Sequence, residues 1–365
     1  MQGKPVYVNG IEPDPSDNLL SSCIEDVFLN STDDLKWLKS GDIVLLKPAL
    51  NSGNPYPSTT HRLSIQTLAK ILTENGAKVV IGDQSGIRNV LHDSTGVIYG
   101  NSRDNYVNAG MSTSCDRRFI GFEEEGWDEG FFHYSSDKTS SWPNGFYVTN
   151  WIHKADHIIN LPRLSTHVQA GATLGFKNMI GIIRDDSRMD YHANGPFNFP
   201  IKFSARRSKL KSIDDKSDTF FEKIVEISDS IRKKLRLTLF VATKAQTTFG
   251  PNKYALEIGK SGIAKAHIMD LNPGMVFGSA DPVAAEAFAL ALLKDVVKSV
   301  PFFPKLFQRL ILFSNRNVTE FGEIPVKNHF YIQHAMKIGL GEMPSQIIYD
   351  NVPMAVQDRL NKNFK

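Results

Sequence analysis

The chain has 365 residues, with 42 lysines and arginines against 39 aspartates and glutamates, so its formal net charge is +3. Hydrophobic residues make up 41% and charged residues 22%, which is ordinary globular usage and excludes a wholly disordered chain. The mild charge does not favour nucleic acid as a partner, and two cysteines, Cys23 and Cys115, are too few for a disulfide framework or an iron–sulfur cluster.

The first predicted elements form a βαβ unit. Residues 42–47 are a short apolar run typical of a buried parallel strand, and residues 61–74 place apolar side chains at helical spacing. Residues 77–82 form a second apolar run. Strand, helix and strand in this order predict an α/β fold, with a mainly parallel sheet and flanking helices.

The middle of the chain is more mixed. Residues 92–145 are rich in polar residues and glycine, which favours an irregular insertion or a lid. A further strand is predicted at 156–161. Residues 202–218 carry many cations and few large apolar side chains, so we expect a surface linker.

The C-terminal part returns to regular patterns. A helix at 219–235 and a strand at 237–242 are predicted, and Asp281 with Pro282 begins a helix at 282–298. Residues 301–313 are apolar with two cations. This pattern favours a buried helix or an oligomer contact over an interfacial membrane helix.

The length suggests two lobes or one large α/β unit. We place an N-terminal lobe at 1–210, which includes the insertion 92–145, and a C-terminal lobe at 211–365. No apolar stretch approaches the ~20 residues of a membrane-spanning helix, and the N-terminus lacks the pattern of a secretory signal. We therefore expect a cytoplasmic protein without a transmembrane segment.

Reactive side chains concentrate after the strand at 156–161, where ligands bind in open α/β sheets. His167 is predicted as an acid/base, and His192 as a metal ligand. Lys177, followed by Asn178, lies in a glycine-rich apolar segment, where burial lowers the pKa of an amine; it would anchor a ligand covalently or electrostatically. The alternative is that these are hydrogen-bonded structural residues between turn glycines.

A second candidate site precedes the helix at 61–74. Ser58, Thr59, Thr60 and Arg62 would bind a phosphate or carboxylate at the start of this helix, next to Lys47 at the end of a strand. Asp83, which follows the next strand, would contact a ribose, a metal or a substrate proton. The alternatives are N-capping by Ser58 or Thr59 and a turn at Asp83.

These motifs resemble the domain-of-unknown-function family numbered 362, which has no single established activity. The resemblance runs from about residue 41 to Gly341, and many relatives carry a ferredoxin-like cysteine cluster that this chain lacks, so no iron–sulfur cluster is expected. It rests on Lys47-Pro48, Gly76 to Gly86, Ala155 to Pro162, Thr166-His167, Gly175 to Asn178, and Gly278 to Ala284.

The arrangement is also similar, more distantly, to the lactate racemase family. That resemblance implies a nickel-pincer nucleotide tethered to Lys177, with His167 catalytic and His192 on the nickel. The family's earlier catalytic histidine would follow Gly82, where this chain has Asp83. Its replacement would come from His61 or His92.

Together these observations predict an enzyme, an isomerase or an oxidoreductase, that transfers a proton or hydride on a small oxygenated substrate bearing a carboxylate or phosphate. The cofactor would be a transition metal or a nucleotide-derived group. One alternative is a metal-free acid–base enzyme acting on an anionic substrate. Another is a non-catalytic protein that binds a small molecule or cofactor. A homo-oligomer is compatible with each.

Overall fold

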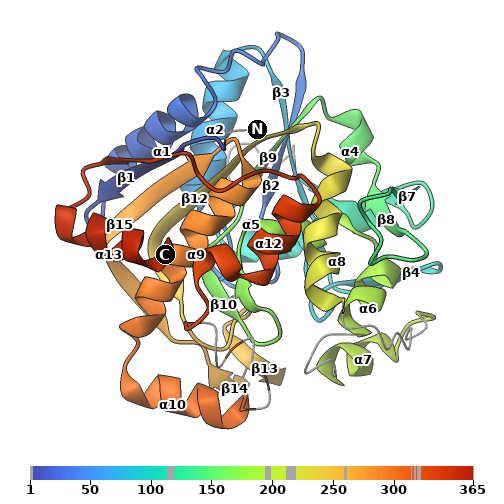
Figure 1. Cartoon of the computed structure of the whole chain (residues 1–365). Coiled ribbons are helices and arrows are strands. Elements are labelled where there is room, and N and C mark those ends of the chain that lie inside the picture. Colours follow the sequence, from blue (N-terminus) through green and yellow to red (C-terminus); the bar gives the residue numbers. More distant parts are fainter. Residues whose placement is uncertain are drawn as a thin grey trace.

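The apolar runs of the sequence form the strands of one large sheet (Figure 1). The structure, a computed structural model, describes residues 3–112, 119–193, 199–210, 219–258, 261–313, 315, 318 and 322–364. The main path across the sheet follows the order β16 (Ile347–Asp350), β1 (Val6–Ile11), β15 (Ile268–Ser279), β12 (Leu235–Gln246), β9 (His157–Leu161), β2 (Ile43–Pro48), β3 (Lys78–Asp83) and β6 (Phe119–Gly121). Two short strands, β10 (Ser165–His167) and β11 (Gly171–Thr173), join beside β12.

The strands from β12 to β6 run parallel to one another, so their carboxyl ends meet at one edge of the sheet. Strand β15 is antiparallel to both of its neighbours, β12 and β1. The predicted α/β fold with a mainly parallel sheet is therefore confirmed. The sheet is continuous across residue 210, and a lobe boundary at that position stays a prediction.

The two faces of the sheet carry two apolar cores. Along β2, Leu45 belongs to one core, whereas Val44 and Leu46 belong to the other, because successive side chains of a strand point to opposite faces. The first core packs against α8 (Phe220–Glu226), α9 (Pro282–Lys298), α12 (Phe330–Lys337) and α13 (Met354–Phe364). The second packs against α1 (Asp17–Ser31) and α2 (Arg62–Glu74).

The predicted βαβ unit and the predicted helix at 282–298 are both present. Elements β2, α2 and β3 match their expected bounds within one residue at most positions. Helix α9 begins as expected, because the Asp281 carboxylate accepts hydrogen bonds from the backbone N–H groups of Val283 (2.8 Å) and Ala284 (3.1 Å). Pro282 occupies the first turn.

Residues 92–145 are not one irregular insertion. Among the described residues, β6 joins the main sheet, and the strands on either side of it form two small hairpins between residues 91 and 149, with a helix after the first hairpin. These strands are only three or four residues long, too short for a recognisable periodicity. The elements of this region are β4 (Leu91–Asp93), β5 (Gly96–Tyr99), α3 (Ser102–Asn108), a 3₁₀ turn (Phe122–Glu125), β7 (Phe131–Tyr134), β8 (Phe146–Thr149) and α4 (Trp151–Lys154).

Three further expectations are corrected. The single helix predicted at 219–235 is α8 followed by a 3₁₀ segment (Ile227–Ile231), and β12 already begins at Leu235. The predicted linker at 202–218 begins inside helix α7 (Phe199–Ala205), and residues 211–218 lie outside the described residues. Helix α10 (Phe302–Ile311) forms within residues 301–313, but its large apolar side chains are mostly exposed, so the buried-helix alternative is wrong and the oligomer contact stays a prediction.

The remaining elements complete the fold. Within the described ranges, no helix is both long and apolar enough to cross a membrane. The segments are α5 (Gly175–Asn178), a 3₁₀ turn (Met179–Ile182), α6 (Asp185–Ala193), the hairpin β13 (Tyr254–Ile258) with β14 (Ser261–Lys265), and a 3₁₀ turn (Val326–Asn328).

Candidate functional site

A cavity of about 320 Å³ lies where the parallel strands β9, β2 and β3 end. This volume is at the lower end of the range for small-molecule sites, and the position is where open α/β sheets bind ligands. The cavity collects the side chains predicted from the segment after β9 and joins them to others from β2 and β3. Its polar lining includes Lys47, Asp83, Arg163, His167, Lys177, Asn178, Arg188 and His192.

Lys47 and Asp83 form a buried ion pair at the ends of β2 and β3. The Lys47 Nζ lies 2.7 Å from the Asp83 Oδ1, and it also donates to the Pro48 carbonyl at 2.8 Å. The Asp83 carboxylate accepts from the backbone N–H groups of Leu50 and Gln84, both at 2.9 Å. Burial lowers the pKa of Lys47 to about 8 against the opposing effect of Asp83. The charges of Lys47 and Asp83 therefore balance each other, and both side chains also hydrogen-bond to nearby backbone groups.

Asn178 ties this pair to strand β9. Its Oδ1 accepts from Lys47 Nζ at 3.2 Å, and its Nδ2 donates to the Asn160 Oδ1 at 2.8 Å. Gly181 leaves the space that the pair needs, because a Cβ atom at this position would lie 1.9 Å from Asp83 Oδ1. Asn178 and Gly181 therefore hold the ends of three strands together.

Lys177 and Arg163 are buried cations of a different kind. Among the described residues, neither forms an ion pair with a carboxylate, although both side chains are nearly inaccessible. Burial, together with the positive charges of Arg163 and Arg188, lowers the pKa of Lys177 to about 7. The neutral amine is therefore much more accessible at neutral pH than in an exposed lysine.

The Arg163 guanidinium has donors to spare. Its Nη1 donates to the carbonyls of Ser58 and Pro251, whereas its buried Nε and Nη2 have no hydrogen-bond partner among the described residues. Burial lowers the pKa of Arg163 to about 9, so the group remains charged at neutral pH. Unpartnered buried N–H groups are costly, and an anionic ligand in the cavity would satisfy them.

His167 is held in one tautomer. Its Nδ1 accepts hydrogen bonds from the backbone N–H groups of Gln169 (3.0 Å) and Ala170 (3.2 Å), so this nitrogen carries no proton. Burial and the nearby charge of Lys177 hold the pKa of His167 well below its usual range. The ring is therefore neutral, with its proton on Nε2. It can donate a hydrogen bond at Nε2, but it is not set up to accept a proton there.

His192 lies on the same cavity, partly buried, at the end of α6. Its ring contacts Tyr191, with 4.3 Å between ring centroids, and the Lys177 Nζ lies 5.5 Å from the Tyr191 ring centroid. Within the part of the chain that the structure describes, the His192 Nδ1 has no hydrogen-bond partner. Burial and the positive charge of Lys177 hold the pKa of His192 well below its usual range, so the imidazole is neutral. A neutral imidazole is the form that binds metals.

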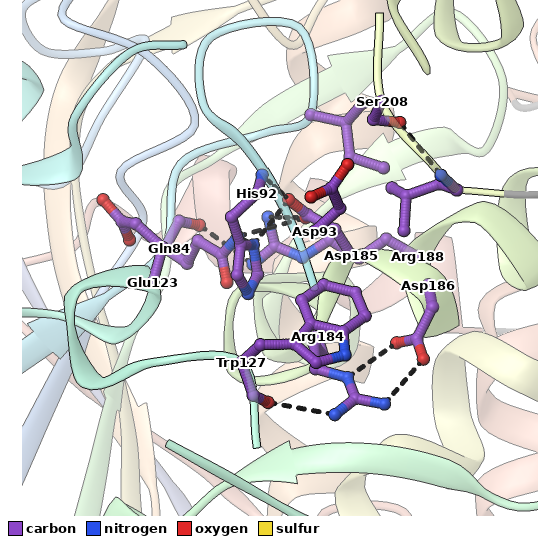
Figure 2. A network of polar contacts seen from close by, with 12 residues as sticks. Gln84, His92, Asp93, Glu123, Trp127, Arg184, Asp185, Asp186, Arg188 and Ser208 are labelled. Atoms are coloured by element: carbon purple, nitrogen blue, oxygen red, sulfur yellow. Dashed lines mark hydrogen bonds and ion pairs between the residues drawn. The ribbon is translucent and has the colours of Figure 1, made fainter. Parts of the chain in front are cut away.

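Behind the cavity, a polar network fixes α6 against the end of β3 (Figure 2). Arg188 donates to four carbonyls, those of Ile183, Ser85, Gln84 and Gly181. Asp185 lies 3.6 Å from the Arg188 guanidinium and contacts the His92 Nδ1 at 2.8 Å. His92 is thus part of this supporting network, and it is not among the residues that line the cavity.

A buried carboxyl supports the segment that carries Lys177. Glu286 on α9 accepts a hydrogen bond from the backbone N–H of Phe176 at 3.2 Å, and its second oxygen has no partner. Burial raises the pKa of Glu286 to about 8, so it is mostly protonated at neutral pH. Gly175 is required here, because a Cβ at this position would lie 2.8 Å from the Glu286 Oε2.

The loop at 58–62 is not brought to the cavity. The hydroxyls of Ser58, Thr59 and Thr60 hydrogen-bond to Gln246, Asn54 and Leu161, respectively. Arg62 pairs with Asp17 on the surface, and the N-cap of α2 is His61, whose Nδ1 accepts from the Leu63 N–H. The predicted phosphate or carboxylate site at the start of this helix is therefore not formed by these side chains.

The functional residues predicted from the sequence do not include Arg163, Arg188 and Glu286. Arg163 had a recognisable signal, because it follows β9 by two residues, in the same place as the side chains that were selected. Arg188 lies on α6 one turn before His192, but nothing in the sequence marks its carbonyl partners. Glu286 lies in the apolar first part of α9, residues 282–293, where its carboxyl is an observable anomaly.

The described residues contain no group of three or more histidine, cysteine, aspartate or glutamate side chains arranged to hold a metal ion. His192 shares the cavity with the His167 imidazole, but the two do not belong to a group of three or more such ligands among the described residues. A metal at this position would need donors from a bound molecule.

Comparison with known proteins gives a family but no activity. Residues 44–291 match the model of the family described as "Domain of unknown function (DUF362)". The chain is 27% identical over 161 residues to the thylakoid-associated protein sll1697 of Synechocystis sp.. This match covers 43% of the chain and 44% of that protein, less than half of its length. No solved structure matches the chain significantly.

Proposed function

This chain belongs to the DUF362 family, and we propose that it is an enzyme that binds a small carboxylate- or phosphate-bearing substrate and moves a proton on a carbon next to an oxygen-bearing group. The observation that carries the proposal is one cavity in which Arg163 and Lys177 have no carboxylate partner among the described residues and His167 is a neutral donor. The three side chains offer separate functions to one ligand.

Arg163 is the anion anchor. Its Nε and one Nη2 group are adjacent donors on a planar guanidinium, a geometry that matches the two oxygens of a carboxylate or phosphate. The substrate anion would satisfy donors that are otherwise buried without partners. This anchor places the neighbouring carbon of a small substrate within the cavity.

Lys177 is the proton acceptor. With a pKa of about 7, a large fraction of its amine is neutral at physiological pH and can take a proton from carbon. Its bound proton is returned to the same carbon or to a neighbouring one when the reaction completes. An ordinary exposed lysine, with a pKa near 10.4, would be almost fully protonated and unable to act in this way.

His167 stabilises the charge that develops. When a carbon next to a carbonyl or carboxylate loses a proton, the electron pair moves to the oxygen. A neutral imidazole with its proton fixed on Nε2 donates a hydrogen bond to that oxygen without itself becoming anionic. His167 thus acts as a donor, and the acid/base role expected from the sequence passes to Lys177.

A nucleotide-derived cofactor is a second candidate at this site. One that brings its own metal donors would need a lysine for attachment and one imidazole, and Lys177 and His192 both line the cavity. When bound, such a group would supply hydride-transfer chemistry. Intact-mass and elemental analysis of freshly purified protein decides this, because a tether adds mass that is lost in Lys177→Arg.

Deuterium exchange tests the main proposal. The full chain is incubated in D₂O with a panel of 2-hydroxy acids, 2-keto acids and phosphorylated hydroxyketones, and loss of the proton signal is followed by NMR. We expect enzyme-dependent exchange at one carbon of at least one compound. Lys177→Met should slow it by roughly 10²–10⁴-fold, the usual contribution of a general base.

The matched control is Lys70→Met, which removes an exposed lysine of α2 and should leave exchange unchanged. Unchanged exchange in a folded Lys177→Met protein would contradict the assignment of the base. Binding of a panel member by calorimetry, with no exchange on any compound, would instead identify a non-catalytic binding protein.

A further inference from the structure

Helix α10 exposes most of its large apolar side chains to solvent and buries a polar side chain. Phe303 and Leu310 are 79% and 64% exposed, whereas Gln308 is 9% exposed. The Gln308 Oε1 accepts a hydrogen bond from the backbone N–H of Phe249 at 3.0 Å, which fastens the helix to the body of the protein. A surface helix ordinarily has the opposite arrangement. The exposed apolar side chains are Phe302, Phe303, Leu306, Phe307, Leu310 and Ile311, with Phe313 just beyond the helix.

Helix α7 and the residues after it resemble α10 in charge. In 199–210 there are four cations and no carboxylate, and in 301–313 there are two cations and no carboxylate. Phe203 on α7 is also exposed. We call the exposed side chains of these two segments the basic–apolar face.

This face borders the mouth of the cavity. Ile201 of α7 lines one part of the cavity, and Ile311 and Leu312 at the end of α10 line another. Figure 1 places α7, α10 and the β13–β14 hairpin along the same lower side of the molecule. The basic–apolar face thus belongs to the same two segments that contribute apolar lining to the cavity.

We propose that the basic–apolar face docks on an anionic lipid surface, so that the cavity opens toward the membrane interface. Phenylalanine and leucine side chains would enter the boundary between headgroups and acyl chains, as in interfacial amphipathic helices. The six cations would lie against the anionic headgroups. Helix α10 lies on the bilayer in this arrangement and does not cross it.

Charge decides between a lipid surface and a second copy of the chain. In a symmetric dimer built on this face, the same patch would meet itself, and cations without interleaved carboxylates would be brought together. An anionic bilayer offers the opposite charge over an extended plane. A fluid lipid surface requires no complementary pocket for each apolar side chain. A row of similar phenylalanines can therefore enter it without a specific partner for each ring.

Vesicle co-sedimentation of the full chain tests the proposal. The probes are vesicles of phosphatidylcholine alone and vesicles that also contain phosphatidylglycerol. We expect binding to the anionic vesicles that is at least about tenfold tighter than to the neutral ones and that weakens at high salt. Failure to bind anionic vesicles at low salt overturns the proposal.

Two variants separate the apolar and charged contributions. Phe303→Ser with Leu310→Ser should weaken binding to both kinds of vesicle about tenfold or more, since both side chains are exposed and can be replaced without opening the core. Lys305→Glu with Arg309→Glu should abolish the preference for anionic lipid. The matched control, Val107→Ser with Met354→Ser, removes exposed apolar side chains on α3 and α13 and should bind like the wild type.

Sedimentation velocity without lipid supplies the competing outcome. We expect a mass that is the same for the wild type and the Phe303→Ser, Leu310→Ser variant. A wild type that self-associates through this face, with the variant monomeric and neither protein bound to vesicles, would overturn the lipid assignment. Equal vesicle binding by the wild type and both variants would do the same.

Discussion

Two lysines line the same cavity under opposite conditions. Lys47 has a carboxylate at 2.7 Å and an amide oxygen at 3.2 Å, whereas Lys177 faces an aromatic ring and two other cations. Both are buried, so burial alone does not distinguish them. The difference indicates that Lys47 holds the strand ends together and that Lys177 is available to a ligand.

The largest expected effect concerns Lys177. Lys177→Arg keeps a positive charge but cannot lose a proton near neutral pH, so proton exchange should fall by roughly 10²–10⁴-fold, as for Lys177→Met. In the wild type, the rate at limiting substrate should rise with pH through about 7, where the amine becomes neutral. The pH–rate profile measures this. A Lys177→Arg protein that exchanges normally would show that charge alone is sufficient.

Substitution of Lys47 should affect stability above all. Lys47→Met leaves Asp83 as a buried carboxylate without its cation, which typically costs about 3–5 kcal/mol of unfolding free energy. Urea denaturation measures the loss. The double variant Lys47→Met with Asp83→Asn should recover much of it, because no charge is then left unpaired. If Lys47→Met is as stable as the wild type, the two lysines do not differ in the way that their contacts indicate.

Arg163 should contribute to ligand binding by an intermediate amount. Arg163→Gln removes the charged donors that have no partner, so calorimetry should give weaker binding of a small carboxylate or of inorganic phosphate, by about 1.5–3 kcal/mol. Arg62→Ala is the matched control and should leave affinity unchanged, because Arg62 pairs with Asp17 on the surface. Equal losses of binding affinity in both variants would indicate that the anion binds at the start of α2.

A pH-dependent effect on stability is expected at Glu286. Its pKa is raised to about 8 in the folded protein, so between pH ~5 and 8 the unfolded chain releases this proton first. Stability should therefore fall with rising pH by up to about 1.4 kcal/mol per unit from this group. Glu286→Gln cannot titrate, so its stability relative to the wild type should rise over that interval. Parallel stability curves would show that the carboxyl is already ionised.

The sequence was sufficient for the parallel core and for several of the side chains that line the candidate cavity. Apolar runs such as 42–47 and 77–82 mark strands buried on both faces, and the carboxyl ends of such strands meet at one edge. His167, Lys177 and His192 were selected because they follow β9. The structure places all three on the cavity together with Arg163, which has the same position but was not selected.

The pairing of charges was out of reach, because it depends on contacts between distant segments. The sequence predicts one anion site that contains Lys47 and Arg62. In the structure, Lys47 pairs with Asp83, whereas Arg62 pairs with Asp17 on the surface. The tautomer of His167 likewise depends on two backbone N–H groups whose direction no side-chain pattern reveals. For α10, the sequence predicts an apolar segment with two cations, but it does not predict that the apolar side chains face solvent.

The continuity of the sheet also sets an order of events during synthesis. The Ser279 hydroxyl donates to the Pro5 carbonyl across 274 residues of sequence, and β1 pairs with β15 on one side and with β16 on the other. On a ribosome, β1 emerges long before either partner exists, whereas β2, β3 and β9 have their neighbours much sooner. The half of the sheet that carries the cavity can therefore assemble while β1 is still unpaired. During that period β1 exposes an unpaired strand edge, the kind of surface that chaperones bind.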